Sequence, residues 1–555
     1  MWLSRAWPGR AAAHLAAWAP LVYGLAKSLA NGWVATSDNS VIALRSLDVL
    51  TSHGPLVGQA TRLGAGVFDL GPIQYWLLAV PVRLDPVHGV LWGGTLWAMV
   101  AASLTVEAAW AVGGVLAALA GSAVVVGVAW WIPALTTVPC WNPWLGLMFF
   151  IAALAAGWAV MSGHRGWWAA AVISASIAAQ GHLMFAVAAA AVVVLAFAVG
   201  LTDTVLSKAG YWWAVAGVAA TIACWAAPLT QQFTADPGNM TAVFSPQGPP
   251  APEAGVTFGL KALSAAAQPP AYWWQPMDSL GKLSNLWARP AAGGVIALAI
   301  IVVCLVVAIV WLRSRRAAGL AALSLVLAVA ALVTFARIPV GEISATTVTL
   351  DTLLYLLTPV YPLGVLTWIT VVTVAVLAGR RIKAKAGTGA IAGSTAADGT
   401  TIGAAAQGLA YRGVPVSVFA AAALVVAAIL AGPIGNKQPI GTPVQLEVMH
   451  EVSGITARIE HKIPPRRIAL KVLTRDNRYR RQLTFGVAYA LRADGYLPEV
   501  AKGWSQQLGD LYWYQGERIE PLPLALVSVR PTLTVTVMRH PPPGVWAGTR
   551  QLASH

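Results

Sequence analysis

Long uncharged runs dominate the pattern of apolar and polar positions along the chain. A helix needs about 20 apolar residues to cross the hydrocarbon core of a bilayer, and several runs of that length or more lack Asp, Glu, Lys and Arg. They include 108–164, 166–202, 209–235, 290–312, 317–336, 352–379 and 413–436. The pattern therefore predicts a polytopic α-helical membrane protein, in which each of the two longest runs, 108–164 and 166–202, holds two helices or a broken pair.

Helix ends placed within and around these runs give about eleven transmembrane helices. They are 11–34, 88–110, 113–132, 144–162, 167–180, 183–201, 210–228, 291–312, 317–337, 353–378 and 413–432. Three basic clusters then fall on one side of the membrane. They are Arg5 and Arg10; Arg313, Arg315 and Arg316; and Arg380, Arg381, Lys383 and Lys385. By the positive-inside rule the N-terminus is cytoplasmic, and the odd number of spans puts the C-terminus outside a plasma membrane.

The spans form a predicted transmembrane domain over residues 1–432. Two long outer loops cover 35–87 and 229–290, and a cytoplasmic linker covers 380–412. Small residues fill 386–411, which is typical of a flexible linker. Within the first outer loop, 68–84 is apolar but short for a span, so it reads as a helix lying in the membrane interface.

The polar C-terminal region, 433–555, has a different pattern. Alternating apolar residues at 467–473, 524–529 and 533–538 predict strands, and 483–496 has the apolar spacing of a helix that ends at Gly495. The order strand, helix, strand, strand indicates a small α/β domain. We expect it outside the membrane.

Composition narrows the class further. The chain is 57% hydrophobic and 10% charged, whereas soluble domains carry about 25% charged residues, so a purely soluble protein is excluded. The formal charge of +15 fits cytoplasmic loops and anionic lipid, and no nucleic-acid partner is expected. The three cysteines are too widely spread for a disulfide framework or a metal site. The absence of a P-loop motif excludes a nucleotide-driven pump.

Asp38 is the first candidate for chemistry, because it follows the first span directly. A carboxylate at the outer membrane surface beside apolar walls suits a general base. The alternative is a helix cap, since Ser37, Asp38 and Asn39 are all capping residue types and an apolar helix pattern follows. Arg45 and Asp48 stand three apart on that helix, which favours an i,i+3 ion pair over a direct role in substrate binding.

Asp69 is a second outer-face acid, at the head of the interfacial helix. It either holds a sugar hydroxyl or a metal ion, or it caps that helix. His53 in the same loop is a weaker candidate for acceptor binding.

The segment 139–144, "PCWNPW", supplies further candidates between the third and fourth spans. The rings of Trp141 and Trp144 suit stacking on sugar C–H faces, and Asn142 suits hydrogen bonds to hydroxyls. The alternative is an aromatic belt with a proline-defined turn.

Gln180 and His182 are polar groups inside an apolar run, where such groups usually face a cavity or a partner. Gly181 between them indicates a break where two half-spans meet. A half-helix N-terminus there suits a lipid phosphate, and the alternative is a histidine satisfied by a backbone carbonyl. Lys27, near the outer end of the first span, either reaches the head groups or meets the phosphate.

With these residues assembled, the chain resembles a GT-C fold membrane glycosyltransferase over roughly residues 1–380. The resemblance is closest to the protein-mannosyltransferase and aminoarabinose-transferase branch and its actinobacterial cell-envelope relatives. It rests on the acid in "TSDNS" after the first span, on "GPIQYWLLAVPVRL" and on the polar "QGH" turn. Two departures are Asn39, where many members carry a second acid, and "GPI" in place of Pro-Pro-Leu.

The resemblance implies transfer of a sugar from a polyprenyl-phosphate donor to an envelope glycan or lipid acceptor on the outer face, with arabinofuranose or mannose as the typical sugar. Asp38 takes the position of the family's catalytic base. The donor's lipid phosphate falls to Gln180, His182 and Lys27. No cofactor is implied with certainty, and Asn39 leaves a divalent cation open.

Two other functions remain as alternatives. One is a non-catalytic GT-C-like scaffold that partners an envelope enzyme, and the two departures favour it. The other is a transporter of lipid-linked glycans, which needs a central polar pathway that the uncharged spans do not provide.

Overall fold

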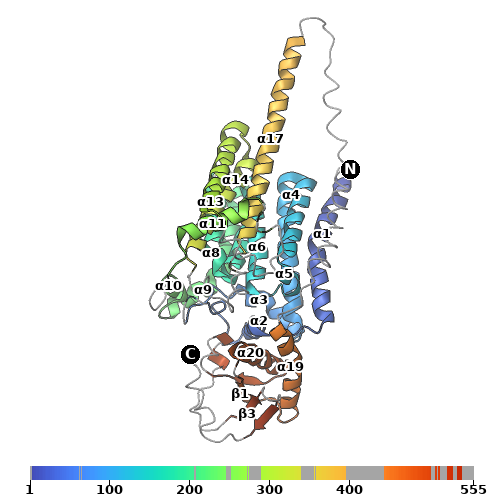
Figure 1. The fold of residues 1–555 in the computed structure, drawn as a ribbon, viewed down its shortest axis with the longest axis vertical. Coiled ribbons are helices and arrows are strands. Elements are labelled where there is room, and N and C mark those ends of the chain that lie inside the picture. Colours follow the sequence, from blue (N-terminus) through green and yellow to red (C-terminus); the bar gives the residue numbers. More distant parts are fainter. Residues whose placement is uncertain are drawn as a thin grey trace.

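The computed structural model describes the chain in segments. The described residues are 3–61, 63, 66–204, 208–245, 252–269, 271, 273, 289–338, 356, 358–394, 443–474, 476–501, 507–508, 510–512, 522–528 and 534–539. Within them a bundle of long helices lies above a small region that contains a sheet, and two short helices lie where the two parts meet (Figure 1).

The bundle consists of long helices joined mostly by short turns. They are α1 (Leu3–Ala30), α4 (Gly89–Trp131), α6 (Asn142–Met161), α7 (Trp168–Gly181), α8 (Leu183–Thr204), α9 (Lys208–Thr234), α11 (Gly255–Ala267), α13 (Ala291–Val306), α14 (Arg315–Ala336) and α17 (Val360–Ser394). A π-helical turn, Val307–Leu312, extends α13. The shorter helices are α2 (Ser37–Asp48), α3 (Ile73–Leu84), α5 (Pro133–Thr137) and α10 (Asn239–Phe244).

Seven helices in the described part are long and apolar enough to cross a membrane, namely α4, α6, α8, α9, α13 with its π turn, α14 and α17. The protein is therefore helical with the character of a membrane protein. α1 and α7 coincide with predicted spans but are not among the seven: α1 carries Arg5, Arg10 and Lys27, and α7 has 14 residues. The predicted span 413–432 lies outside the described residues, so the count of eleven stays a prediction.

One helix, α4, covers two predicted spans, 88–110 and 113–132. Its backbone breaks at Gly114, where φ is +66° and ψ is −150°. This left-handed φ costs a glycine little, because it has no Cβ. The two halves then fold back on each other, since a Cβ on Gly121 would lie 3.3 Å from the Cβ of Ala109.

The core of the bundle is aliphatic and aromatic, with Phe150 and Phe185 stacked at 5.2 Å between ring centroids. The outer faces are apolar as well: Trp212 and Ile222 on α9 and Val303 on α13 are exposed. Helices that are apolar all round are typical of a protein surrounded by lipid.

The predicted interfacial helix corresponds to α3. Its outward residues Trp76, Val80 and Leu84 follow at four-residue spacing and are 44%, 64% and 74% exposed. An apolar stripe of this kind on a short helix suits burial in the head-group region.

The predicted linker differs from the structure in its first part. α17 continues as a helix to Ser394, through residues that the small-residue composition assigns to a flexible segment. Alanines at 384, 386, 390 and 392 sustain the helix, because alanine has the highest helix propensity. Residues 395–412 and the predicted domain boundary at 433 lie outside the described part.

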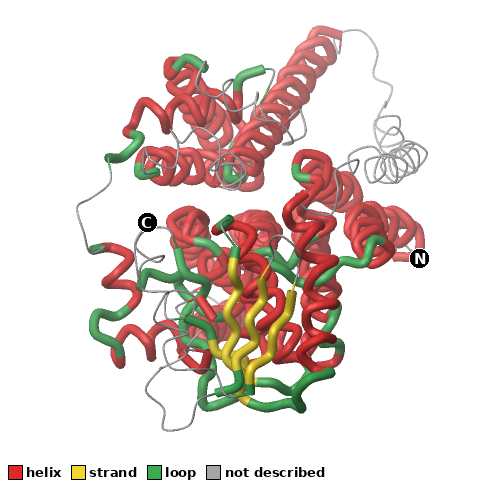
Figure 2. Tube along the Cα trace, turned by 60° about the horizontal axis from the view of Figure 1, so that its bottom comes forward, coloured by secondary structure: helices red, strands yellow, loops and turns green. Residues whose placement is uncertain are grey.

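A four-stranded sheet lies at the other end of the molecule. Its strands are β1 (Arg467–Leu473), β2 (Leu497–Glu499), β3 (Leu524–Ser528) and β4 (Thr534–Met538), in the order β2-β1-β3-β4. β1 is parallel to β2 and β3, and β4 is antiparallel to β3. Two helices, α19 (Pro443–Glu460) and α20 (Asn477–Ala493), pack with the sheet. Figure 2 shows the strands side by side.

The start of α20 lies six residues before the predicted helix, and β2 is absent from the prediction. The helix pattern is hidden because the first turns, "NRYRRQ", are strongly polar. Gly495 follows the helix with φ +87°, and the Tyr496 N–H donates to Leu491 O at 2.9 Å, so the turn after α20 is closed at this glycine.

The C-terminal region and the first outer loop share one hydrophobic core. Ile42 and Leu44 of α2 belong to the same buried cluster as Leu483 and Phe485 of α20. Polar contacts join the two parts as well: the Tyr489 hydroxyl donates to Pro86 O, and the Tyr512 hydroxyl donates to Asp48 Oδ1 at 2.9 Å. The C-terminal region is therefore packed onto α2, α3 and the start of α4.

Three basic clusters lie at the same end of the molecule. The N-terminal end of α1, the turn between α13 and α14 and the far end of α17 all lie at the upper end, opposite the sheet (Figure 1). These three places carry the three basic clusters named above.

Candidate functional site

Asp38 lies in the first turn of α2, at the junction between the bundle and the C-terminal region. Its Oδ2 accepts a hydrogen bond from Trp141 Nε1 at 3.1 Å, and its Oδ1 forms an ion pair with Arg481 Nη2 at 3.0 Å. The carboxylate side chain is 30% exposed. The cap interpretation does not describe this geometry, because the N-cap of α2 is Thr36 and no side chain makes a cap bond there.

The backbone beside Asp38 is strained. Ser37 has φ +52°, in the left-handed region that a non-glycine residue occupies at a cost of about 1–3 kcal/mol. The Gln59 amide also donates to Asp38 O at 3.1 Å and so holds this turn from the following loop. Strain of this kind is often found at functional sites, where the surrounding structure fixes it.

Asp69 is buried and is held by two donors. Its Oδ2 accepts from Asn142 Nδ2 at 3.1 Å, and its Oδ1 accepts from the Leu183 N–H at 3.1 Å. Asp69 therefore caps the start of α8 instead of α3, whose N-cap Pro72 receives no side-chain bond. Burial raises the pKa of Asp69 to about 8; the hydrogen bonds from Leu183 and Asn142 counteract part of the rise, and the charge of Asp38 makes a smaller contribution to it.

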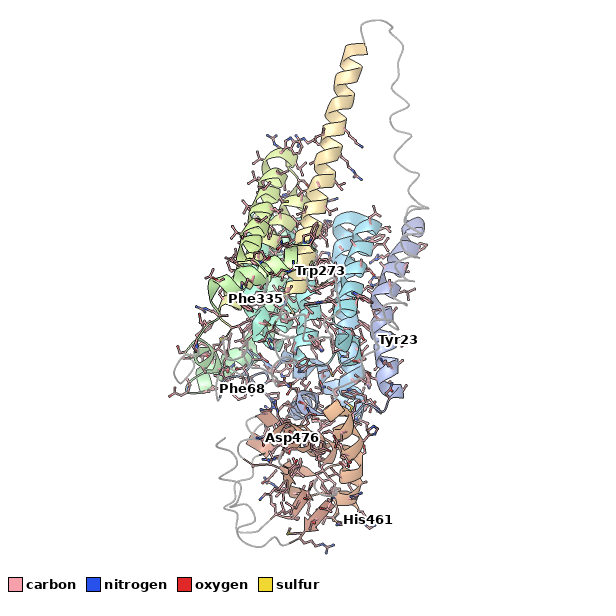
Figure 3. The ribbon with its side chains drawn as sticks, in the orientation of Figure 1. Tyr23, Phe68, Trp273, Phe335, His461 and Asp476 are labelled. Atoms are coloured by element: carbon pink, nitrogen blue, oxygen red, sulfur yellow. The ribbon has the colours of Figure 1, made fainter. Side chains whose placement is uncertain are left out.

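Asp69 also ties the two outer loops together. The Asn239 amide donates to Phe68 O at 3.1 Å and to Asp69 O at 3.3 Å, and Asn239 Oδ1 accepts the Phe68 N–H at 2.9 Å. Figure 3 shows Phe68 near the level at which the bundle meets the C-terminal region, with Asp476 below it.

The break between α7 and α8 lies directly beside Asp69. Asn142 Nδ2 donates to Gly181 O at 3.0 Å as well as to Asp69, so one amide holds the acid and the end of α7. Gln180 donates to Cys224 O at 2.7 Å on α9, while its Oε1 is buried without a hydrogen-bond partner among the described residues.

His182 is the single residue between the two helices. Its Nδ1 accepts the Met184 N–H at 3.3 Å, and burial lowers its pKa to about 4. The imidazole is therefore neutral near pH 7. The α8 N-terminus, a type of place that suits an anion, already donates its Leu183 N–H to the carboxyl group of Asp69.

The remaining predicted site residues are Trp144, Lys27 and His53. Trp144 is buried, and its ring packs against that of Trp141 in a T-shaped arrangement with 4.9 Å between the centroids. Lys27 lies in the last turn of α1, next to Ser28, whose hydroxyl donates to Thr137 O. His53 is exposed in the turn after α2.

Asp48 forms the predicted i,i+3 ion pair with Arg45. Its side chain is fully buried, Arg45 contacts it at 3.1 Å, and Tyr512 donates to it from the C-terminal region. Burial raises the pKa of the Asp48 carboxyl, and Arg45 and Tyr512 counteract this rise. The pair is part of the contact between the first outer loop and the C-terminal region.

Arg481 is the residue that sequence reasoning missed. It lies on α20, and its Nη2 contacts both Asp38 and Gln507 Oε1 at 3.0 Å, while its guanidinium lies over the Phe485 ring at 5.6 Å. No local signal relates it to Asp38, because 443 residues separate them.

The described residues contain no cluster of three or more His, Cys, Asp or Glu side chains with the spacing of a metal site. Asn39, where the resemblance expects a second acid, is buried, and its Oδ1 accepts a weak bond from Cys140 Sγ at 3.5 Å. The site thus contains two carboxyl groups, those of Asp38 and Asp69, and each accepts hydrogen bonds from a different set of donors.

The site therefore contains a partly exposed, ion-paired carboxylate, Asp38, and a buried, largely protonated carboxyl group, Asp69, beside a helix break. No protein-family model matches the chain, and no curated protein matches it.

Proposed function

We propose that the protein transfers a sugar, arabinofuranose or mannose, from a polyprenyl-phosphate donor to a cell-envelope glycan or lipid acceptor. The observation that carries the proposal is the setting of Asp38: a partly exposed carboxylate, oriented by Trp141, at one end of a membrane-type helical bundle. A second acid, Asp69, interacts with Asp38 electrostatically, and burial raises the pKa of Asp69 to about 8. A carboxyl group whose pKa is raised by burial is typical of acid–base sites.

In the proposed reaction Asp38 is the general base. One of its carboxylate oxygens takes the proton of an acceptor hydroxyl as that oxygen bonds to the anomeric carbon of the donor sugar. The bond from this carbon to the phosphate oxygen breaks, and its electron pair leaves with the polyprenyl phosphate. A single displacement of this kind inverts the anomeric configuration.

The neighbouring residues suit binding roles in this reaction. Trp141 is partly exposed and offers a ring next to the base, with Trp144 packed against it. Gln180 has an unused buried acceptor, and His182 is a neutral imidazole at the helix break. These two face the lipid side in the proposal, with Lys27 farther along the same membrane surface.

The charge distribution supports an outer-face site. The three basic clusters lie at the end of the molecule opposite the sheet, and positive charge favours the cytoplasmic side. In the proposal the protein is therefore a multi-pass plasma-membrane protein whose acid site and C-terminal region face outward. The exposed apolar stripe of α3 rests at the lipid surface beside the site.

A transfer assay tests the proposal. Purified full-length protein receives radiolabelled polyprenyl-phosphate arabinose or mannose and a mixed envelope-glycan acceptor. We expect Asp38→Asn to lower the transfer rate about 10²–10⁴-fold, the usual contribution of a general base. Asp236→Asn, at an exposed acid of the second outer loop, is the matched control and retains the rate.

A folded Asp38→Asn protein with the full rate would remove Asp38 from the mechanism. Folded wild-type protein that uses neither donor would favour the second candidate function, a non-catalytic scaffold. The specific observation in favour of a scaffold is the ion pair between Asp38 and Arg481, which occupies the carboxylate.

A further inference from the structure

Arg481 is the most unusual charged group at the junction, because its anion is the proposed base. It reaches Asp38 from α20, in the C-terminal region, and shares Nη2 with Gln507. Its Nε is buried and has no hydrogen-bond partner among the residues that the structure describes. The Nε–H of Arg481 is therefore a hydrogen-bond donor that none of these residues uses.

Two other guanidinium groups described at this junction, those of Arg45 and Arg83, bind structural partners. Arg45 donates to Asp48 and to Leu508 O. Arg83 donates to the carbonyls of Ser46, Leu47 and Val49 at the end of α2. Only Arg481, among these three, contacts a carboxylate that the proposed reaction uses.

A phosphate group needs charge and hydrogen-bond donors at this place. The N-terminus of α8 offers donors, but Asp69 already accepts the Leu183 N–H there. A guanidinium with a planar fork of donors matches phosphate oxygens in pairs, which an ammonium does not.

We infer that Arg481 binds the phosphate of the polyprenyl-phosphate donor and leaves Asp38 when it does so. The inference rests on the proposed function and deepens it. In the resting protein the guanidinium neutralises the base. When the donor binds, Arg481 exchanges the carboxylate for the phosphate, stabilises the negative charge of the leaving group and frees Asp38 for the acceptor hydroxyl.

The exchange makes the base available only when donor is present. It also gives the C-terminal region a direct part in the reaction, since α20 supplies the exchanging group. Phe485 beneath the guanidinium and Gln507 beside it position Arg481 for both partners.

Binding of undecaprenyl phosphate, without a sugar, tests the inference. Full-length protein in nanodiscs of neutral lipid is titrated with this probe, and the shift in melting temperature gives the dissociation constant. We expect Arg481→Gln to weaken binding at least tenfold and Arg481→Lys to weaken it less. Arg466→Gln removes the same charge at an exposed position of the C-terminal region and binds as the wild type does.

Asp38→Asn supplies a second, opposite readout. If Arg481 must leave Asp38 to bind phosphate, removal of the carboxylate's charge releases it, and the variant binds undecaprenyl phosphate several-fold more tightly than the wild type. A purely structural ion pair predicts unchanged or weaker binding. This readout stands even if Arg481→Gln does not fold.

Further arms identify the source of the phosphate. Inorganic phosphate alone, or phosphatidylglycerol in the nanodisc, is expected to compete poorly, and full competition by either would overturn the assignment to the lipid-linked donor. Equal binding by wild type and Arg481→Gln would overturn the inference and leave the transferase proposal standing. Folded wild-type protein that does not bind undecaprenyl phosphate would overturn both.

Discussion

Trp141 and Asn142 are neighbours in the chain, yet each donates to a different carboxyl group. Trp141 holds Asp38, which is partly exposed and paired with a guanidinium from the C-terminal region. Asn142 holds Asp69, which is buried against the start of α8 and has a pKa of about 8. The two acids therefore suit different roles. Asp38 is accessible enough to exchange a proton with a substrate, whereas Asp69 holds the helix break and the two outer loops together.

The largest effect on stability is expected when the buried acid, Asp69, loses the amide of Asn142 that donates to it. Asn142→Leu leaves two buried acceptors, Asp69 Oδ2 and Gly181 O, without the amide that serves both. At about 1–3 kcal/mol for each unsatisfied group, we expect a loss of about 3 kcal/mol in unfolding free energy, measured by unfolding in detergent micelles. Asn31→Leu, at an exposed asparagine, is the control and changes stability by about 0.5 kcal/mol or less. Equal losses in both variants would contradict the role of Asn142.

A pH series sharpens the difference between the two acids. The folded-state pKa of Asp69 is about 8, and the ordinary value in an unfolded chain is about 3.9. Between these values the folded state binds the extra proton, so the unfolding free energy falls as pH rises, by about 1.4 kcal/mol per pH unit. From pH 6 to pH 8 we expect roughly 2 kcal/mol of loss in the wild type beyond that in Asp69→Asn. Parallel melting curves for the two proteins would contradict the burial of a protonated Asp69.

The smallest effect is expected at Asp38, the partly exposed acid. Trp141→Phe keeps an aromatic ring against Trp144 but removes the N–H that Asp38 accepts. We expect transfer to slow about tenfold, which corresponds to about 1.4 kcal/mol, with the melting temperature almost unchanged. Trp97→Phe, which removes a comparable indole bond to Leu77 O, should leave transfer at the wild-type rate. A Trp141→Phe protein with the full rate would show that the indole N–H does not orient the base.

The helices of the bundle could be predicted because a helix surrounded by lipid or by other apolar helices is itself a long apolar stretch of sequence. The predicted span 144–162 lies within two residues of α6 at each end, and 291–312 matches α13 with its π turn. Even the break in α4 is visible as the glycine pair at 113 and 114. An uncharged run of sufficient length is a local signal.

The candidate site could be predicted only in part, because its contacts are not local. The pairing of Asp69 with Asn142 and with the start of α8 depends on three segments that meet only in the folded chain. Asp69 precedes α3 and so looks like a cap for it, but the Leu183 N–H takes its oxygen instead. Arg481 stands in a polar stretch with nothing to distinguish it from Arg480 beside it.

The shared core of the first outer loop and the C-terminal region has a consequence for biosynthesis. Asp38 and Arg481 are 443 residues apart, and at about 5–20 residues per second of synthesis roughly 20–90 s pass between them. During that interval Ile42 and Leu44 have been made, but the α20 residues that cover them have not. The proposed site is thus assembled among the last events of synthesis, and a nascent chain carries an uncovered apolar loop until α20 arrives.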